Sequence, residues 1–445
     1  MSSRPNVLFV VLDTLRADRV SALGYDRETT PSFDQFAANA TLFTDAVAQA
    51  PWSVPSHASL FTGKYPRDHG ATTASPVLRG NPTLPSLLSR EGYHTYAYSP
   101  NEYVRPATGF GQGFDEFHTD STVTEPTLTA DLAGPAVNWL TSTATVRRPI
   151  ERAFNAIREC NPTMTDPDPP RDSTDLDRVT ELLDRASEPF FLFVNLIDAH
   201  LPRSPDPAHI EQFVDADLDD ATIVANERAQ TVGDFEMDER GFERLAGLYD
   251  ADVRTLDDRL GRLLDHCRAS GLLEDTLVVL VSDHGEHLGE FGLVGHQFSV
   301  FDQVTSVPLA IQFPAGGPDR VDEQVEIRRL FDTVLDETGV RASPERSLAS
   351  GTPDEVAAGS FHSPMIDVSQ LLWSQRVKYD RKLLGEPLSF ARTGSEKLVS
   401  FDGEEWSFAV PETPTDRLSE DEVRELRNQV REWQSATDAH PEISN

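Results

Sequence analysis

The chain has 445 residues, with 39 Lys and Arg against 74 Asp and Glu, which gives a formal net charge of −35 at neutral pH. This acidic excess excludes a general nucleic-acid-binding protein, because neutralising phosphates requires clustered lysine and arginine. An acidic surface with only four lysines stays hydrated at high salt, where screening weakens self-repulsion, so we expect a halophilic, haloarchaeal origin. An ordinary acidic cytosolic enzyme is the alternative.

The composition, with 38% hydrophobic and 25% charged residues, is that of a globular protein. Cys160 and Cys267 stand in no CxxC spacing, so we expect two structural thiols rather than a metal site or a disulfide framework. No segment offers the ~18 consecutive apolar residues that cross a bilayer. The apolar run at residues 6–12 ends on Asp13 without a cleavage site, which favours a buried strand over a secretion signal. We therefore expect a cytoplasmic location.

Three apolar runs, at residues 6–12, 190–197 and 276–281, share one design. Each is rich in β-branched or aromatic residues and continuous rather than alternating, as in central strands that are covered on both faces. Asp13, Asp198 and Asp283 follow them, and amphipathic segments at residues 175–186 and 245–269 predict intervening helices. The pattern predicts an α/β protein with a large, mostly parallel central sheet flanked by helices and a site at the carboxyl ends of its strands.

Two stretches interrupt this alternation. Residues 119–173 are rich in Thr, Pro and Asp, and residues 201–240 carry three prolines before an acidic helical pattern. Because both adjoin candidate site residues, they could form a lid or a substrate rim, and surface decoration is the alternative.

The pattern changes again after residue 345. Residues 346–364 are expected to form a linker, followed by short strands near 388–391, 397–401 and 406–410. Ser419 and Glu422 have capping-box spacing and predict a helix to about residue 436. We therefore expect a catalytic domain at residues 1–345 and a small sheet-plus-helix subdomain at 346–445.

Ser53 stands at the predicted start of a helix whose first turn holds Pro55. One interpretation is a helix cap, in which the Ser53 hydroxyl accepts a backbone hydrogen bond. The other is a nucleophile, because an oxygen at a helix N-terminus sits where backbone N–H groups favour an incoming anion.

The residues Ser53, Pro55, Ser56, His57, Leu60, Thr62 and Gly63 resemble the signature of the sulfatase family, within the alkaline-phosphatase-like superfamily, in a serine-type form. Further segments resemble the family in the same order: 5–13, 30–36, 43–46, 66–70, 109–117, 191–202, 249–257, 276–296, 307–309 and 391–397. Several independent motifs in one order make the resemblance specific.

The resemblance implies one divalent metal ion, bound by Asp13, Ser53, Asp283 and His284. Hard oxygen ligands suit Ca²⁺, and an imidazole ligand shifts the preference toward Mn²⁺ or Zn²⁺. His200 and His296 resemble the residues that contact the transferred group and protonate the leaving oxygen, a task suited to the pKa of histidine. With His57 they form the expected substrate-binding set, and Ser53, His200 and His296 form the catalytic set.

Several positions depart from the family pattern. His57 replaces the signature arginine, Thr14 replaces the second aspartate of an Asp-Asp pair, and residues 99–101 offer no Lys-x-His equivalent. These departures leave open whether a maturation enzyme oxidises Ser53 to formylglycine or whether unmodified Ser53 attacks. Arg16, Lys64, Arg67 and Arg105 could add positive potential for an anion, although a solvated surface role is the simpler interpretation for each.

The expected function is hydrolysis of a sulfate ester, through Ser53 or its formylglycine form, on a small-molecule or glycan substrate. The first alternative is hydrolysis of a phosphodiester, phosphonate or phosphate monoester by unmodified Ser53. The second alternative is a non-catalytic anion-binding protein. Retention of acidic and histidine ligands together with a nucleophile argues against the second alternative.

Overall fold

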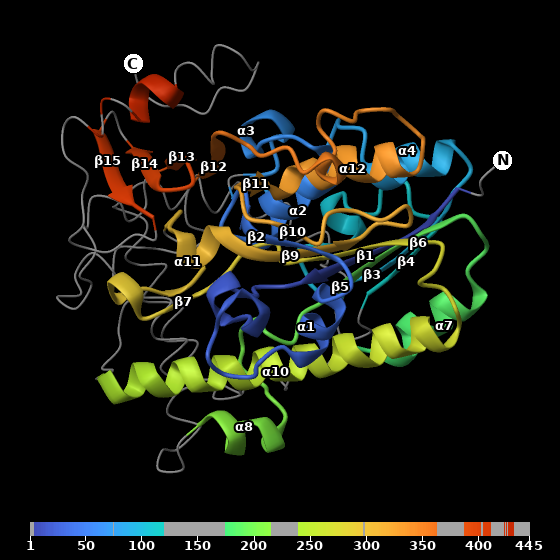
Figure 1. Cartoon of the computed structure of the whole chain (residues 1–445), viewed down its shortest axis with the longest axis horizontal. Coiled ribbons are helices and arrows are strands. Elements are labelled where there is room, and N and C mark those ends of the chain that lie inside the picture. Colours follow the sequence, from blue (N-terminus) through green and yellow to red (C-terminus); the bar gives the residue numbers. More distant parts are fainter. Residues whose placement is uncertain are drawn as a thin grey trace, which may run out of the picture. The chain divides into compact units, whose positions relative to one another are not determined.

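In the computed structural model, the three apolar runs form β1 (Asn6–Leu12), β5 (Phe190–Leu196) and β6 (Thr276–Val281) in the middle of a nine-stranded sheet (Figure 1). Every residue of these strands is buried, and β1 pairs in parallel with both β5 and β6. The predicted α/β class is therefore confirmed. The structure describes residues 4–73, 75–119, 174–214, 239–296, 299–362, 387–401, 404–410, 422, 424 and 426–430.

The strand order of the central sheet is β10 (Arg320–Val321), β2 (Thr41–Val47), β9 (Ser306–Gln312), β6, β1, β5, β3 (His94–Tyr98) and β4 (Glu116–His118), with β11 (Val325–Glu326) also paired to β2. Among the described strands of this sheet, only β9 runs antiparallel to its neighbours, so the sheet is mostly parallel as predicted.

Helices cover both faces of the sheet (Figure 1). Alternate residues of β1 enter two separate cores: Phe9 packs on one face and Val10 on the other. Burying a side chain of this size stabilises the fold by about 1.5–3 kcal/mol. The long helix α10 (Glu239–Ala269) packs with α1 (Pro31–Ala37) and α7 (Leu176–Arg185), and α2 (Ser53–Thr62) packs with α4 (Leu84–Arg90) and α12 (Leu330–Glu337).

Both predicted helices are present, although α10 begins six residues before the predicted start at residue 245. Asp175 caps α7 by accepting a hydrogen bond from the Arg178 amide.

Cys267 lies buried in α10 and is free, as expected of a structural thiol, and Cys160 lies outside the described residues. The shorter helices are α3 (Pro66–His69), α8 (Pro207–Phe213) and α11 (Asp302–Thr305), with 3₁₀ turns at Ala17–Arg19, Ser21–Leu23, Pro106–Thr108, Glu290–Gly292, Ile327–Arg329 and Leu348–Ser350.

A second sheet follows near the C-terminus. It is antiparallel, in the order β12 (Ala357–Phe361), β13 (Leu388–Arg392), β14 (Glu396–Phe401) and β15 (Glu404–Ala409). The three predicted strands are confirmed, but β12 lies where a linker was expected, because its Ala-Ala-Gly-Ser sequence carries little strand signal. A Cβ atom on Gly359 would lie 2.3 Å from the carbonyl oxygen of Gln49, so the close approach of β12 to residue 49 requires glycine.

The predicted C-terminal helix is described only at residues 422, 424 and 426–430, where Leu426 and Val430 pack on β13 and β14. The domain boundary at residue 345 stays a prediction. Of the two predicted insertions, residues 120–173 and 215–238 lie outside the described residues, and α8, from the second insertion, packs on α10. Within the described part of the chain, no helix is both long and apolar enough to span a membrane.

Lys397 on β14 joins the second sheet to the rest of the described chain through a buried ion pair. Its Nζ lies 2.8 Å from Oδ1 of Asp302, and the lysine side chain is fully buried. We expect Lys397→Met to lower the free energy of unfolding by about 3 kcal/mol, because Asp302 loses a cationic partner inside the protein. Arg392, 3.4 Å from Asp302, remains and limits the loss.

Denaturant unfolding at constant high salt measures this effect. The matched control is Arg268→Met, because Arg268 pairs with Asp265 at the surface, where both side chains are at least half exposed. That substitution should cost about 0–1 kcal/mol. Equal losses in the two variants would contradict the structural role of Lys397.

Candidate active site

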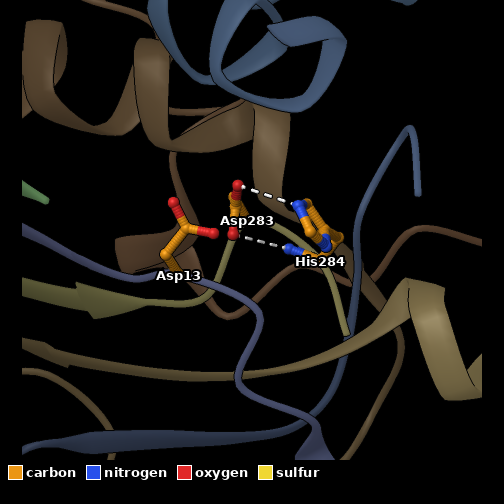
Figure 2. Close-up of side chains that lie close together, drawn as sticks. All are labelled: Asp13, Asp283 and His284. Carbon is orange, nitrogen blue, oxygen red and sulfur yellow. Dashed lines mark hydrogen bonds and ion pairs between the residues drawn. The ribbon is translucent and has the colours of Figure 1, made fainter. Parts of the chain in front are cut away.

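Acidic residues at the ends of β1 and β6 meet at one edge of the central sheet. Asp13 follows β1 directly, and Asp283 and His284 follow β6, the neighbouring strand. One ligand atom from each of these three residues lies within 4.8 Å of the others, and all three side chains are buried. Figure 2 shows the carboxylate of Asp13 turned toward that of Asp283. The carboxyl ends of adjacent parallel strands therefore bring these side chains together, as predicted.

Ser53 lies at the first position of α2 with its hydroxyl directed into this cluster. Its Oγ lies 3.3 Å from Nε2 of His284 and accepts a hydrogen bond of 3.2 Å from the amide of Asn101. The capping interpretation is wrong, because Trp52 is the N-cap residue and no side chain caps the helix. The hydroxyl therefore faces the cluster instead of a backbone amide.

The donor set fits a divalent metal ion. Oδ1 of Asp13 and Oδ2 of Asp283 are buried, and neither accepts a hydrogen bond from the described residues. Nδ1 of His284 lies 2.9 Å from the Gly285 carbonyl oxygen and donates to it, so Nε2 keeps its lone pair and faces Oδ2 of Asp283 at 3.3 Å. Two carboxylate oxygens, a hydroxyl and an imidazole nitrogen match the preferences of Mn²⁺ and Zn²⁺ better than those of Ca²⁺.

The charges in the cluster also favour a cation. Burial, together with the nearby charge of Asp283, raises the pKa of Asp13 to about 6. Burial opposes ionisation of Asp283 as well, but His284 and His57 hold the pKa of Asp283 below its usual range. Burial lowers the pKa of His284 to about 4, so its imidazole is neutral at pH 7, as a metal ligand must be.

Thr14 has a left-handed backbone, with φ of 64°, a conformation that is rare and strained for a β-branched residue. Contacts on both sides hold it. The Thr14 amide donates to Oδ1 of Asp283 at 3.2 Å, and its carbonyl accepts a 2.7 Å hydrogen bond from the Tyr249 hydroxyl. Thr14 thus adds no carboxylate to the site but orients Asp283 through its main chain.

His57 contacts the cluster through Asp283. It is fully buried in α2, and Nδ1 lies 2.9 Å from the Ser53 carbonyl oxygen and 3.2 Å from Oδ2 of Asp283. Its ring contacts Phe110 and Phe193 edge-on. These contacts support Asp283 and the first turn of α2, and the predicted role of His57 in substrate binding stays a prediction.

His200 and His296 lie together beside His284. The ring of His296 lies 4.6 Å from that of His284 and 5.1 Å from that of His200, centroid to centroid. Nδ1 of His200 lies 2.5 Å from the Leu201 carbonyl oxygen and donates to it. The structure therefore brings both predicted histidines to the side of the metal-ligand candidates.

Two asparagines at the site were missed. Asn101 donates to Oδ2 of Asp13 at 2.8 Å as well as to Ser53, and Asn195 donates to the same Asp13 oxygen at 3.0 Å. Asn101 follows β3, which lies next to β5 in the sheet, so the order of the strands explains its position. The strand pattern that marks Asp13 does not mark Asn101, because Asn101 lies three residues after β3, whose sequence His-Thr-Tyr-Ala-Tyr is not a continuous apolar run.

One predicted surface residue is buried. Arg16 is 2% exposed, pairs with Asp18 and Glu290, and donates to the Glu286 carbonyl oxygen at 2.9 Å. The expectation of a solvated Arg16 is therefore wrong, because its guanidinium links the loop after β1 to the segment after β6. Paired in this way, Arg16 acts on the architecture of the site.

A hydroxyl at a helix start, two buried carboxylates and clustered imidazoles are groups that metal-assisted ester hydrolysis uses. The model of the sulfatase family matches residues 5–340, so the chain belongs to the sulfatase family, as the sequence resemblance predicted. It is 22% identical to an arylsulfatase of Clostridium perfringens, over 96% of this chain and 93% of that one. It is 25% identical to an uncharacterized sulfatase of Escherichia coli, over 75% of this chain and 67% of that one.

Solved structures share the fold. The phosphonate monoester hydrolase of Agrobacterium radiobacter superposes with a TM-score of 0.70 at 20% identity, covering 97% of this chain and 95% of that one. Family membership identifies the chain as an ester-hydrolysing enzyme and disfavours the alternative of a non-catalytic anion-binding protein. The particular ester is a separate question.

Proposed function

We propose that this enzyme hydrolyses sulfate monoesters of a small-molecule or glycan alcohol, with Ser53 or its formylglycine form as the nucleophile. The observation that carries the proposal is the direction of the Ser53 hydroxyl, 3.3 Å from His284 in the cluster with Asp13 and Asp283. Sulfatase relatives that align over most of the chain, such as the arylsulfatase, support the choice of sulfate.

The residues suggest how the chain performs the reaction. Asp13, Ser53, Asp283 and His284 would hold one divalent ion. When bound, such an ion polarises the ester and lowers the pKa of the Ser53 hydroxyl. With its proton released to solvent, Ser53 Oγ attacks the sulfur as the alkoxide, a new S–O bond forms, and the bond to the alcohol oxygen breaks. His296 or His200 gives that oxygen its proton, and water then releases sulfate from Ser53.

The amide of Asn101 has a specific place in this scheme. It donates both to Ser53 Oγ, at 3.2 Å, and to Oδ2 of Asp13, at 2.8 Å. The hydroxyl is therefore held beside the carboxylate before substrate arrives, which removes part of the entropic cost of the attack.

A second candidate is hydrolysis of a phosphonate monoester, phosphodiester or phosphate monoester by unmodified Ser53. The imidazole of His284 among the ligand candidates favours it, because the resemblance indicates an asparagine at this position in many sulfatases and a histidine in phosphate- or phosphonate-handling members. The same fold occurs in a phosphonate monoester hydrolase. An unmodified serine would form a covalent seryl ester, and water hydrolyses a phosphorus ester of serine more readily than a sulfate ester of serine.

Paired assays separate the candidates. Purified enzyme, supplied with Mn²⁺, Zn²⁺ or Ca²⁺ at molar salt, is given nitrophenyl sulfate, a nitrophenyl phosphonate monoester and a nitrophenyl phosphodiester. The proposal predicts the highest kcat/KM for the sulfate. A higher value for either phosphorus ester would replace it by the second candidate. Peptide mass spectrometry on protein from its native host reports whether Ser53 has lost two hydrogen atoms, as formylglycine made by a maturation enzyme requires.

We also propose that the surface is adapted to a salt-rich cytoplasm. Carboxylates in surface ion pairs are well exposed, with 74% of the Asp265 side chain and 66% of the Glu181 side chain accessible, whereas the Glu286 and Asp252 side chains are fully buried beside Arg203. Salt therefore screens the repulsion between the exposed carboxylates, and it screens the buried ion pairs much less.

The net charge of −35 makes the folded state depend on that screening. Lowering the KCl concentration from about 2 M to about 0.1 M lengthens the Debye length from a few ångström to about 10 Å, and we expect the melting temperature to fall by more than about 10 °C. Differential scanning fluorimetry across KCl concentrations measures it. A melting temperature independent of KCl would contradict the proposed adaptation.

A further inference from the structure

A buried carboxylate stands directly behind His296. Oε1 of Glu286 lies 3.0 Å from Nδ1 of His296, and the Glu286 side chain is fully buried. Its other oxygen, Oε2, lies 3.4 Å from Nη2 of Arg203. Both carboxylate oxygens of Glu286 therefore have a cationic or hydrogen-donating partner, and one of these is a histidine of the expected catalytic set.

A short hairpin brings Glu286 and His296 together. In the antiparallel pair of β7 (His287–Leu288) and β8 (Val294–Gly295), His287 lies opposite Gly295. Glu286 precedes His287 and His296 follows Gly295, so the register places the two side chains side by side. Gly295 has φ of +85°, a conformation that a residue with a side chain rarely adopts, and it sets the direction in which the chain enters His296.

The backing of Glu286 is rigid. Arg203 donates to the Ala199 carbonyl oxygen at 2.7 Å, lies 3.5 Å from Asp252, and stacks over the ring of Tyr249 at 4.8 Å. The Arg203 side chain is 1% exposed. The carboxylate is thus held from behind by a guanidinium that cannot swing away, and Glu286 in turn limits the rotation of the imidazole.

The geometry points to Glu286 as the positioning residue that orients His296 as the proton donor to the leaving-group oxygen. This inference rests on the proposed ester hydrolysis. The Glu286 carboxylate accepts the Nδ1–H of His296, which directs Nε2 to the substrate from a ring that lies between His284 and His200.

Over one turnover, His296 donates one proton and regains one. As the bond from sulfur or phosphorus to the alcohol oxygen breaks, Nε2 of His296 gives its proton to that oxygen. When water then attacks the ester of Ser53, its proton returns to Nε2. Glu286 keeps its charge throughout and acts only by holding Nδ1–H.

Leaving-group dependence tests the inference, because proton donation matters most when the departing oxygen is strongly basic. We compare Glu286→Gln with the wild type on two substrates with the same acid group, one a nitrophenyl ester and the other an alkyl ester. We expect kcat/KM to fall about 100-fold or more for the alkyl ester and less than about tenfold for the nitrophenyl ester. His296→Gln should show the same asymmetry, and adding Glu286→Gln to it should cost little more.

Glu290→Gln is the matched control, because Glu290 belongs to the same hairpin segment and pairs with Arg16 at 2.7 Å rather than with His296. It should change the two substrates by equal factors. Equal losses on both substrates in Glu286→Gln, or none, would overturn the inference. If Glu286→Gln does not fold, His296→Gln decides, since equal losses there would remove the proton donor itself. A wild type that cleaves no anionic ester would instead refute the proposed function.

Discussion

Ser53→Ala is expected to lower kcat/KM by at least about 10³-fold, because the substitution removes the attacking atom while leaving helix α2 in place. The Ser53 hydroxyl caps no helix, and its contacts are His284 and Asn101 at the site. Stability should change by no more than about 1 kcal/mol, the net value of one hydrogen bond. Steady-state kinetics with the best aryl ester measures the loss.

The matched control is Ser59→Ala, on the same helix. Ser59 is also buried, but its hydroxyl lies 3.2 Å from Nε2 of His69, away from the cluster. We expect a similar small change in stability and kcat/KM within about threefold of the wild type. If Ser53→Ala retained wild-type turnover, another group would have to be the nucleophile and the proposed chemistry would be wrong.

Asp283→Asn is expected to weaken Mn²⁺ binding by more than about 100-fold. Losing a residue that merely supports a metal ligand already costs 10- to 100-fold in many sites, and Asp283 is itself a candidate ligand with a buried oxygen directed at the cluster. The asparagine keeps an oxygen that can accept from the Thr14 amide but supplies no charge. Equilibrium dialysis followed by metal analysis measures binding without reference to activity.

Asp257→Asn serves as the control for this change. Asp257 is likewise fully buried, but its carboxylate accepts from the amides of Ser32 and Phe33 at the start of α1. It should lose stability and retain Mn²⁺ affinity. Unchanged affinity in Asp283→Asn, with Asp257→Asn behaving the same way, would show that the cluster is not the metal site.

The framework of the site could be predicted because it depends on local sequence. A continuous apolar strand that ends on an acidic residue is visible as a pattern, and parallel strands place their carboxyl ends at one edge. Those two facts place Asp13 and Asp283 at one edge of the sheet, and the family resemblance indicated them as metal ligands. Asp198 also follows such a strand but accepts a hydrogen bond from Thr174 and pairs with Arg259. Asn101 is not marked by this pattern, because it is not acidic and the strand before it, β3, carries a histidine and a threonine.

Other features depend on contacts between distant segments. His57 meets Asp283 across 226 positions, and Thr14 meets it across 269. The burial of Arg16 follows from its pairing with Glu290, 274 residues away. None of these pairings leaves a periodic pattern in the sequence. Composition and spacing therefore favoured a solvated Arg16 and did not indicate which way the side chain of His57 points.

The sequence by itself determined the acidic composition, the α/β alternation and the identity of the strand-end residues. The alternation can be recognised because strands buried on both faces require continuous apolar runs, and strand direction fixes which residues lie at their carboxyl ends. Only the tertiary structure decided which ring nitrogen of His284 and of His296 makes a hydrogen bond with the protein. It also decided that Ser53 points into the cluster instead of capping its helix, and that Glu286 contacts His296. Those features are set by side-chain direction and hairpin register, which differ between residues only a few positions apart and are established when the segments pack together.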